Sequence, residues 1–135
     1  MEVRAEFPLP DVEWPLLRGF WSNAAEGVLA MPRTSDGAWQ WYPKTEDVEW
    51  VPFSGRGIVF SWTEVHQVFL PAFADQVPYL TGLVSLDDAP EIRLATRFVD
   101  PDTIEIGDHV EVTFRSLRFT TVAGEVRAPF FRPVI

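Results

Sequence analysis

The stretch that decides the fold is IVFSWTEVHQVFL, residues 58–70. Side chains of different character alternate along it, so that Val59 and Ser61 fall on one face and Phe60 and Trp62 on the other. A two-residue period of this kind is typical of a β-strand with one face toward a core. We therefore predict one long strand here, of the length that a coiled barrel needs where its sheet turns a corner.

Further strand patterns follow toward the C-terminus, separated by turn signals. They lie at Tyr79–Leu86, at Ile92–Val99, around the alternating residues 109–115, and at 119–122 and 125–132, the last two as a strand pair or as one irregular strand around Gly124. The sequences DDAP (87–90) and DPD (100–102) have the composition of turns. About five strands without a long helix between them predict a small antiparallel barrel or sandwich, of the OB or SH3 type.

The N-terminal part has a different pattern. Residues 1–12 are expected to form an extended arm, and the apolar residues within 13–27 recur at the three- and four-residue spacings of a short amphipathic helix. We predict a hairpin over residues 27–50. The polar turn RTSDG (33–37) separates an apolar run from the aromatic run Trp39 to Tyr42.

The amino-acid composition disfavours or excludes several classes of function. The net charge is −9, with 20 acidic and 11 basic residues, which disfavours a general nucleic-acid binder because such proteins need clusters of Lys and Arg. The chain has no cysteine, so disulfides, thiolate catalysis and Cys-ligated metals are excluded. No signal peptide or membrane span is recognisable, and we expect a cytoplasmic protein.

The segment EWVPFSGRGIVFSWTEVH, residues 49–66, resembles the pattern W-x-x-x-S-G-x-G-x-V-x-S-W-T-x-x-H of the acyl-CoA-associated OB-fold family. Other pieces follow in the family's order: Pro71 and Phe73, Pro78 and Tyr79, IEIGDHVEVTF (104–114) and FRP (131–133). The resemblance implies an N-terminal helix, a rubredoxin-like zinc ribbon and an OB-fold barrel.

The sequence departs from this family at the ribbon, where members carry two Cys-x-x-Cys knuckles. Residues 33–37 replace the first knuckle, and the second is deleted, because Lys44 runs almost directly into 45–50. A structural zinc needs four nitrogen or sulfur ligands, and His66 and His109 are far apart in sequence. We predict no zinc and a hairpin held by aromatic packing, which would involve Trp39, Trp41, Tyr42 and Trp50.

The predicted fold is mainly β: a five-stranded OB-fold barrel preceded by a short N-terminal helix and a degenerate, metal-free zinc-ribbon hairpin. The expected segments are an arm and helix (1–26), the hairpin (27–50) and the OB-fold domain (51–135).

The predicted function comes from the family resemblance. It implies a non-catalytic accessory subunit in acyl-CoA or lipid metabolism that binds or stabilises a thiolase-like or hotdog-fold hydratase-like partner enzyme, with acyl-CoA as a possible ligand and no covalently bound cofactor. A scaffold domain without ligand binding is the main alternative. A nucleic-acid-binding OB-fold would need a basic groove with interleaved aromatics, and a stand-alone enzyme has no supporting constellation of residues.

The expected ligand-binding residues are Arg56, Ser61, Trp62, Thr63, His66, Phe73 and Tyr79, and the expected partner contacts are Trp39 and Trp41. Each has a plainer interpretation. The segment 54–57 is either an anion-binding bend with Arg56 on a CoA phosphate or a simple glycine bend. His66 fits a barrel-mouth or interface residue better than a catalytic base. The aromatic residues either line an acyl slot or fill the barrel, and the acidic pairs at 87–88 and 100–102 fit turns better than a catalytic dyad.

Overall fold

The computed structural model describes residues 9–101, 103–119 and 122–134. The expected arm therefore lies mostly outside the described residues, as do Asp102 of the predicted DPD turn and the 120–121 part of the last strand pair.

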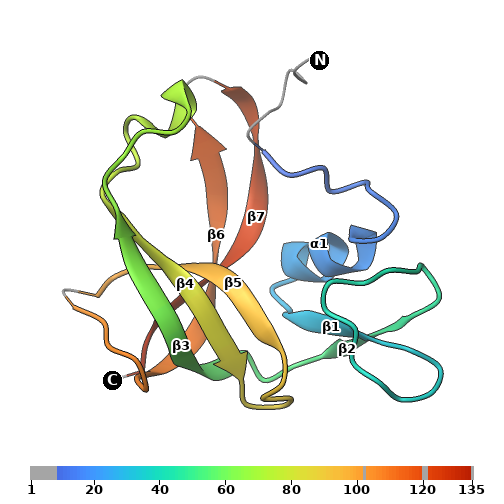
Figure 1. The fold of residues 1–135 in the computed structure, drawn as a ribbon. Helices are drawn as coiled ribbons and strands as arrows, with labels where there is room; N and C mark the ends of the chain where they lie inside the picture. The colour runs from blue at the N-terminus through green and yellow to red at the C-terminus, as the bar shows by residue number, and fades with distance from the viewer. Residues whose placement is uncertain (1–8, 102, 120–121, 135) are drawn as a thin grey trace.

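The prediction of a five-stranded barrel is confirmed. Its strands are β3 (Arg56–Val65), β4 (Tyr79–Leu86), β5 (Arg93–Phe98), β6 (His109–Phe119) and β7 (Val122–Pro133). They close in the order β3-β4-β5-β7-β6 (Figure 1), and the last strand pairs back to the first. This is the order of a Greek-key OB barrel. All pairings are antiparallel except that of β5 with β7, which joins Phe98 to Phe131.

The barrel interior is apolar, because the inward positions of the strands carry aliphatic and aromatic side chains. Val59, Val84, Val110 and Phe131 have no more than 1% of their surface exposed. Two-residue alternation of this kind puts one face of each strand inside. The 10-residue strand β3 also contains a bulge between Val59 and Ser61, which bends it around the barrel.

Two predicted boundaries differ. The strand predicted over 58–70 ends at Val65, because its partner β4 begins at Tyr79 opposite that residue, after Pro78, which has no N–H to continue the ladder. The segment beyond contains only a short 3₁₀ helix, η1 (Pro71–Phe73). At the C-terminus, β7 is one continuous strand that passes through Gly124 at a φ of 95°.

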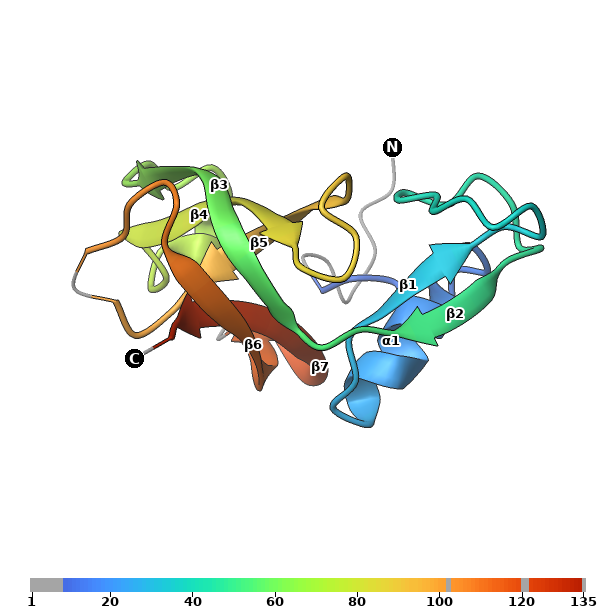
Figure 2. The same cartoon turned by 90° about the horizontal axis from the view of Figure 1, so that it is seen from below.

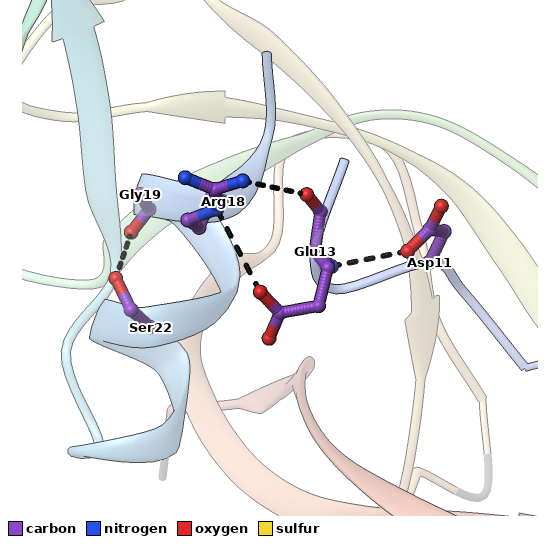
Figure 3. Close-up of polar contacts among 5 residues, drawn as sticks. All are labelled: Asp11, Glu13, Arg18, Gly19 and Ser22. Atoms are coloured by element: carbon purple, nitrogen blue, oxygen red, sulfur yellow. Dashed lines mark hydrogen bonds and ion pairs between the residues drawn. The ribbon is translucent and has the colours of Figure 1, made fainter. Parts of the chain in front are cut away.

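The helix is shorter than predicted: α1 spans Arg18–Ala25 rather than the whole of 13–27. Pro15 disfavours helical geometry at the preceding residue, and residues before α1 form turns instead. Figure 3 shows how these turns are tied to the helix: Arg18 reaches both the carbonyl oxygen and the carboxylate of Glu13, at 3.1 and 3.7 Å. The backbone N–H of Glu13 in turn donates to Asp11.

The ribbon has a different pairing from the predicted hairpin. Strand β1 (Ala30–Arg33) pairs with β2 (Glu49–Pro52), and not with the aromatic run after the turn. That run contributes one isolated bridge, between Arg33 and Trp39. The prediction of a strand partner at 39–42 was wrong, because these aromatic side chains are used for packing against other elements rather than for a ladder.

The ribbon and α1 lie together beside the barrel, as Figures 1 and 2 show from two directions. Strand β2 leads almost directly into β3, and it crosses the expected junction between residues 50 and 51. The division into 1–26, 27–50 and 51–135 remains a prediction.

Candidate functional site

Several of the expected ligand-binding residues meet at one end of the barrel. Phe73 of η1 packs edge-on against Phe119 of β6, with ring centroids 4.8 Å apart, and lies 6.4 Å from the ring of Tyr79. Thr63 and Trp62 of β3 pair with Thr81 and Gly82, two and three residues inside this end. Trp62 keeps 43% of its surface exposed. The barrel end thus offers partly exposed aromatic surface.

Arg56 lies apart from this group. It begins β3, and Tyr79 pairs with Val65 at the opposite end of the strand. With a rise of about 3.3 Å per residue, the two ends are separated by at most about 30 Å along this bent strand. Arg56 and the barrel-end aromatics therefore do not form one compact site.

The bend before Arg56 has a structural cause. The backbone N–H and hydroxyl of Ser54 both donate to the carboxylate of Asp88, at 3.0 and 2.5 Å. Gly55 has a φ of 81°, and a Cβ there would lie 2.3 Å from Val112. The glycine is needed for close approach of the chain to β6, and Asp88 is used in holding this bend.

His66 lies just beyond the end of β3. Its Nε2 is 2.6 Å from Oε1 of Glu64, and both side chains are largely exposed. A general base in an acyl-transfer site would also need a nucleophile within reach. Within the described residues no hydroxyl group is hydrogen-bonded to this imidazole.

The expected partner contacts are half-buried in the chain itself. Trp39 packs edge-on against Phe53 with centroids 4.9 Å apart, and Arg33 lies over its ring. Trp41 packs against Phe20 of α1 at 5.2 Å. The next residue, Tyr42, stays 60% exposed, so the ribbon loop presents an aromatic edge to solvent.

The turn that replaces the first zinc knuckle is held by hydrogen bonds. The Asp36 carboxylate accepts from the hydroxyl of Thr34 and from the backbone N–H of Ala38, and these bonds keep the pKa of Asp36 below its ordinary value of 3.8. Arg33 reaches Glu49 across the β1–β2 pair at 3.4 Å. These polar contacts hold the turn and join β1 to β2.

Zinc content is directly testable. The chain has no cysteine, and the described residues contain no cluster of three or more potential His, Asp or Glu ligands. We expect purified protein to contain no stoichiometric zinc and to keep its melting temperature in EDTA, because the described residues form no four-ligand site that a chelator could empty. One zinc per chain by elemental analysis, with a melting temperature that falls on chelation, would contradict this prediction.

One residue that the sequence did not single out occupies a distinctive position. Arg97 of β5 borders two hollows, one of about 340 Å³ beside α1 and the ribbon loop and one of about 360 Å³ at the barrel end. Its guanidinium lies 4.9 Å from the ring centroid of Tyr79, one of the predicted ligand residues. The hollow at the barrel end includes Tyr79 and Leu80 of β4 as well as Arg97 and Phe98 of β5, the pair of strands that OB barrels use for ligands.

Comparison with known proteins identifies the family. Residues 50–115 match the family described as "ChsH2, C-terminal OB-fold domain". A "DUF35 domain-containing scaffold protein" of Pyrococcus furiosus is 32% identical over 67% of this chain and 67% of its own length. The chain belongs to the DUF35 family of acyl-CoA-associated OB-fold proteins.

Two further DUF35-related matches extend the comparison. The scaffold protein of the same description from Methanothermobacter thermautotrophicus is 33% identical over 64% of the chain. The "3-oxo-4,17-pregnadiene-20-carboxyl-CoA hydratase alpha subunit" of Mycobacterium tuberculosis is 29% identical over 70% of it. The chain spans 65% of the first of these relatives and 32% of the second.

A solved structure matches nearly the whole DUF35 chain described here. The structure is named "Ltp2-ChsH2(DUF35) aldolase", and the match covers 93% of this chain and 100% of that one, with a TM-score of 0.74 and 26% identity. The helix and ribbon are therefore part of the shared architecture, along with the barrel. No helix among the described residues is long and apolar enough to cross a membrane.

Proposed function

We propose that this DUF35 protein is a non-catalytic accessory subunit that docks onto an enzyme of acyl-CoA metabolism. The observation that carries the proposal is the match over almost the full chain to a DUF35 chain solved as part of an aldolase. The relatives named as scaffold proteins and the hydratase subunit support it from sequence. A thiolase-like or hotdog-fold hydratase-like enzyme is the proposed partner, in the cytoplasm.

The side-chain chemistry supports a binding role rather than catalysis. In the described part of the chain, several acidic side chains hold turns or pair with arginines, as Asp88 does at Ser54 and Glu111 does with Arg132. A catalytic site would bring together a base, an orienting group and a reacting group. The exposed aromatic surface of the ribbon loop and barrel end suits contact with a protein or an apolar ligand.

The proposed ligand is acyl-CoA, bound at the barrel end. Ser61, Trp62, Thr63, His66, Phe73 and Tyr79 are the proposed contacts there, and Arg56 is a separate candidate contact for a phosphate at the other end of β3. The principal alternative is a scaffold without ligand binding, which the names of the two archaeal relatives favour.

Co-purification tests the docking role. Co-expressed with a thiolase-like or hydratase-like enzyme encoded next to its own gene, the chain is expected to elute as a stable complex. Trp39→Ala and Trp41→Ala are expected to weaken that complex tenfold or more, as about 2 kcal/mol per buried aromatic anchor implies. Trp14→Ala, at an exposed position among the turns before α1, is the matched control and should have no effect.

Two outcomes separate the hypotheses. Calorimetric titration of the complex with an acyl-CoA should show a heat of binding, and the Trp62→Ala variant should show a smaller one. A complex that forms but shows no heat of acyl-CoA binding favours the scaffold without ligand binding. The accessory-subunit proposal itself would be refuted if the chain bound none of these enzymes while circular dichroism showed that it and its variants were folded.

A further inference from the structure

The hollow between the barrel and the N-terminal elements has an unusual lining. It is formed by α1, the ribbon loop and strands β5, β6 and β7, and encloses about 340 Å³. Its walls are mostly apolar, with Phe20, Trp21, Leu94 and Phe130 among them, and they contain no acidic residue. Arg97 is the one charged residue that lines it. The chain as a whole has a net charge of −9, so this hollow differs in having a single positive charge in its lining.

The charge of Arg97 is weakly compensated. Its Nη1 donates to the neutral amide oxygen of Gln76 at 2.8 Å, and no carboxylate pairs with it among the described residues. Its Nε–H is buried without an acceptor. Desolvation lowers the pKa of the guanidinium, an effect that the nearby Tyr79 opposes. An anion beside Arg97 would pair with its charge and offset the free-energy cost of burying it.

A second unpaired donor belongs to the same lining. The indole Nε1–H of Trp41 is buried and has no acceptor within the described part of the chain. Buried polar groups are normally hydrogen-bonded, so two orphan donors on residues of one hollow require an explanation. A bound molecule that carries acceptor oxygens supplies one.

The second hollow next to Arg97 is a poorer place for an anion. It also contains Glu64 and Asp100, and although Asp100 pairs with Arg115, these carboxylates make its walls mixed in charge. The apolar hollow has one cation and no competing acid, so it matches a ligand with one negative charge and a hydrocarbon body.

We propose that this hollow binds an apolar monocarboxylate, with the hydrocarbon part against α1 and the ribbon loop and the carboxylate on Arg97. A molecule with several phosphates fits less well, because Arg97 is the one charged residue that lines the hollow. The hollow shares Arg97 with the barrel end, where its guanidinium lies over Tyr79, but none of the proposed acyl-CoA contacts lines it. The proposal does not depend on the docking function. It would let the subunit respond to a free acid as distinct from its CoA thioester.

Tryptophan fluorescence and calorimetry with decanoate as the probe test the proposal, because Trp21 and Trp41 line the hollow. Decanoate is expected to bind the wild-type chain, and decanol, which lacks the charge, to bind at least about tenfold more weakly. Arg97→Gln should weaken decanoate binding by the same factor. Arg93→Gln is the matched control on the same strand and face, since Arg93 lies over Phe60 outside the hollow.

A second variant keeps the proposal testable if Arg97→Gln does not fold. Ala95 is an exposed residue that lines the hollow, and Ala95→Trp should fill the space and abolish binding while Arg97 stays in place. Equal binding of decanoate and decanol, or binding that neither variant weakens, would overturn the proposal. Arg97-dependent binding of decanoyl-CoA without binding of decanoate would also overturn it, and would leave the proposed acyl-CoA function standing.

Discussion

Gly82→Ala is expected to destabilise the protein more than any other single methyl addition considered for this chain. Gly82 lies in the middle of β4, opposite Trp62 of β3. A Cβ built there would lie 2.0 Å from the carbonyl oxygen of Ser61 and 2.7 Å from the Cα of Trp62. Both are backbone atoms of the paired strand, so no rotamer change relieves the clash. We expect a loss of about 3 kcal/mol or more in the free energy of unfolding.

The control for this variant is Gly37→Ala. Gly37 also lacks a side chain and has a φ of 87°, but nothing lies within 4 Å of a Cβ at that position. Only the left-handed backbone penalty of about 1–2 kcal/mol applies there. Urea unfolding followed by tryptophan fluorescence measures both variants. Equal losses would show that close strand approach at Gly82 contributes nothing beyond backbone preference.

Gly19→Ala is expected to destabilise the contact between α1 and the ribbon, although helix propensity predicts the opposite sign. Alanine in a helix interior is favoured over glycine by about 1 kcal/mol. A Cβ at Gly19, however, would lie 2.2 Å from Nε1 and 2.3 Å from Cδ1 of Trp50, whose indole packs directly on the helix backbone. Trp50 belongs to β2 and packs against the core, so moving it separates packed elements. We expect a net loss of about 2 kcal/mol.

Ser22→Ala in the same helix is the matched control. Ser22 is exposed, and its hydroxyl donates only to the carbonyl oxygen of Gly19 at 3.3 Å (Figure 3). Its replacement should be neutral or slightly stabilising, as propensity alone predicts. Thermal unfolding distinguishes the two variants, and a Gly19→Ala protein as stable as the wild type would show that Trp50 repacks freely.

Local patterns were enough to predict most of the barrel. The bounds of β4 agree with the predicted Tyr79–Leu86, because Pro78 and the DDAP turn mark both ends and the strand pairs with its chain neighbours. The partner of β1 could not be predicted in the same way. Trp39 follows the turn immediately, yet Glu49–Pro52 forms the strand, and the choice depends on Phe20 and Phe53, which hold the aromatic run by side-chain packing.

In the candidate site, too, some residues could be predicted from the sequence and others could not. Phe73 and Tyr79 were recognisable because they belong to a family motif, and the structure brings them together. Arg97 carried no signal, since an arginine at an alternating position of a half-exposed strand usually faces water. Its burial comes from Gln76 and Tyr79 and from an apolar hollow built by elements far away in the sequence. A one-dimensional pattern does not contain that information.

The parallel contact between β5 and β7 has a consequence for how the whole chain unfolds. Phe98 and Phe131 form the pairing recorded between these described strands, so little backbone ladder joins them along 94–97. Side chains from α1 and the ribbon loop cover that seam. The ribbon loop and α1 thus pack over the side of the barrel at which β5 and β7 share little backbone pairing. We therefore expect the ribbon and the barrel to unfold together in one transition, because separating them would expose the apolar side chains at this seam.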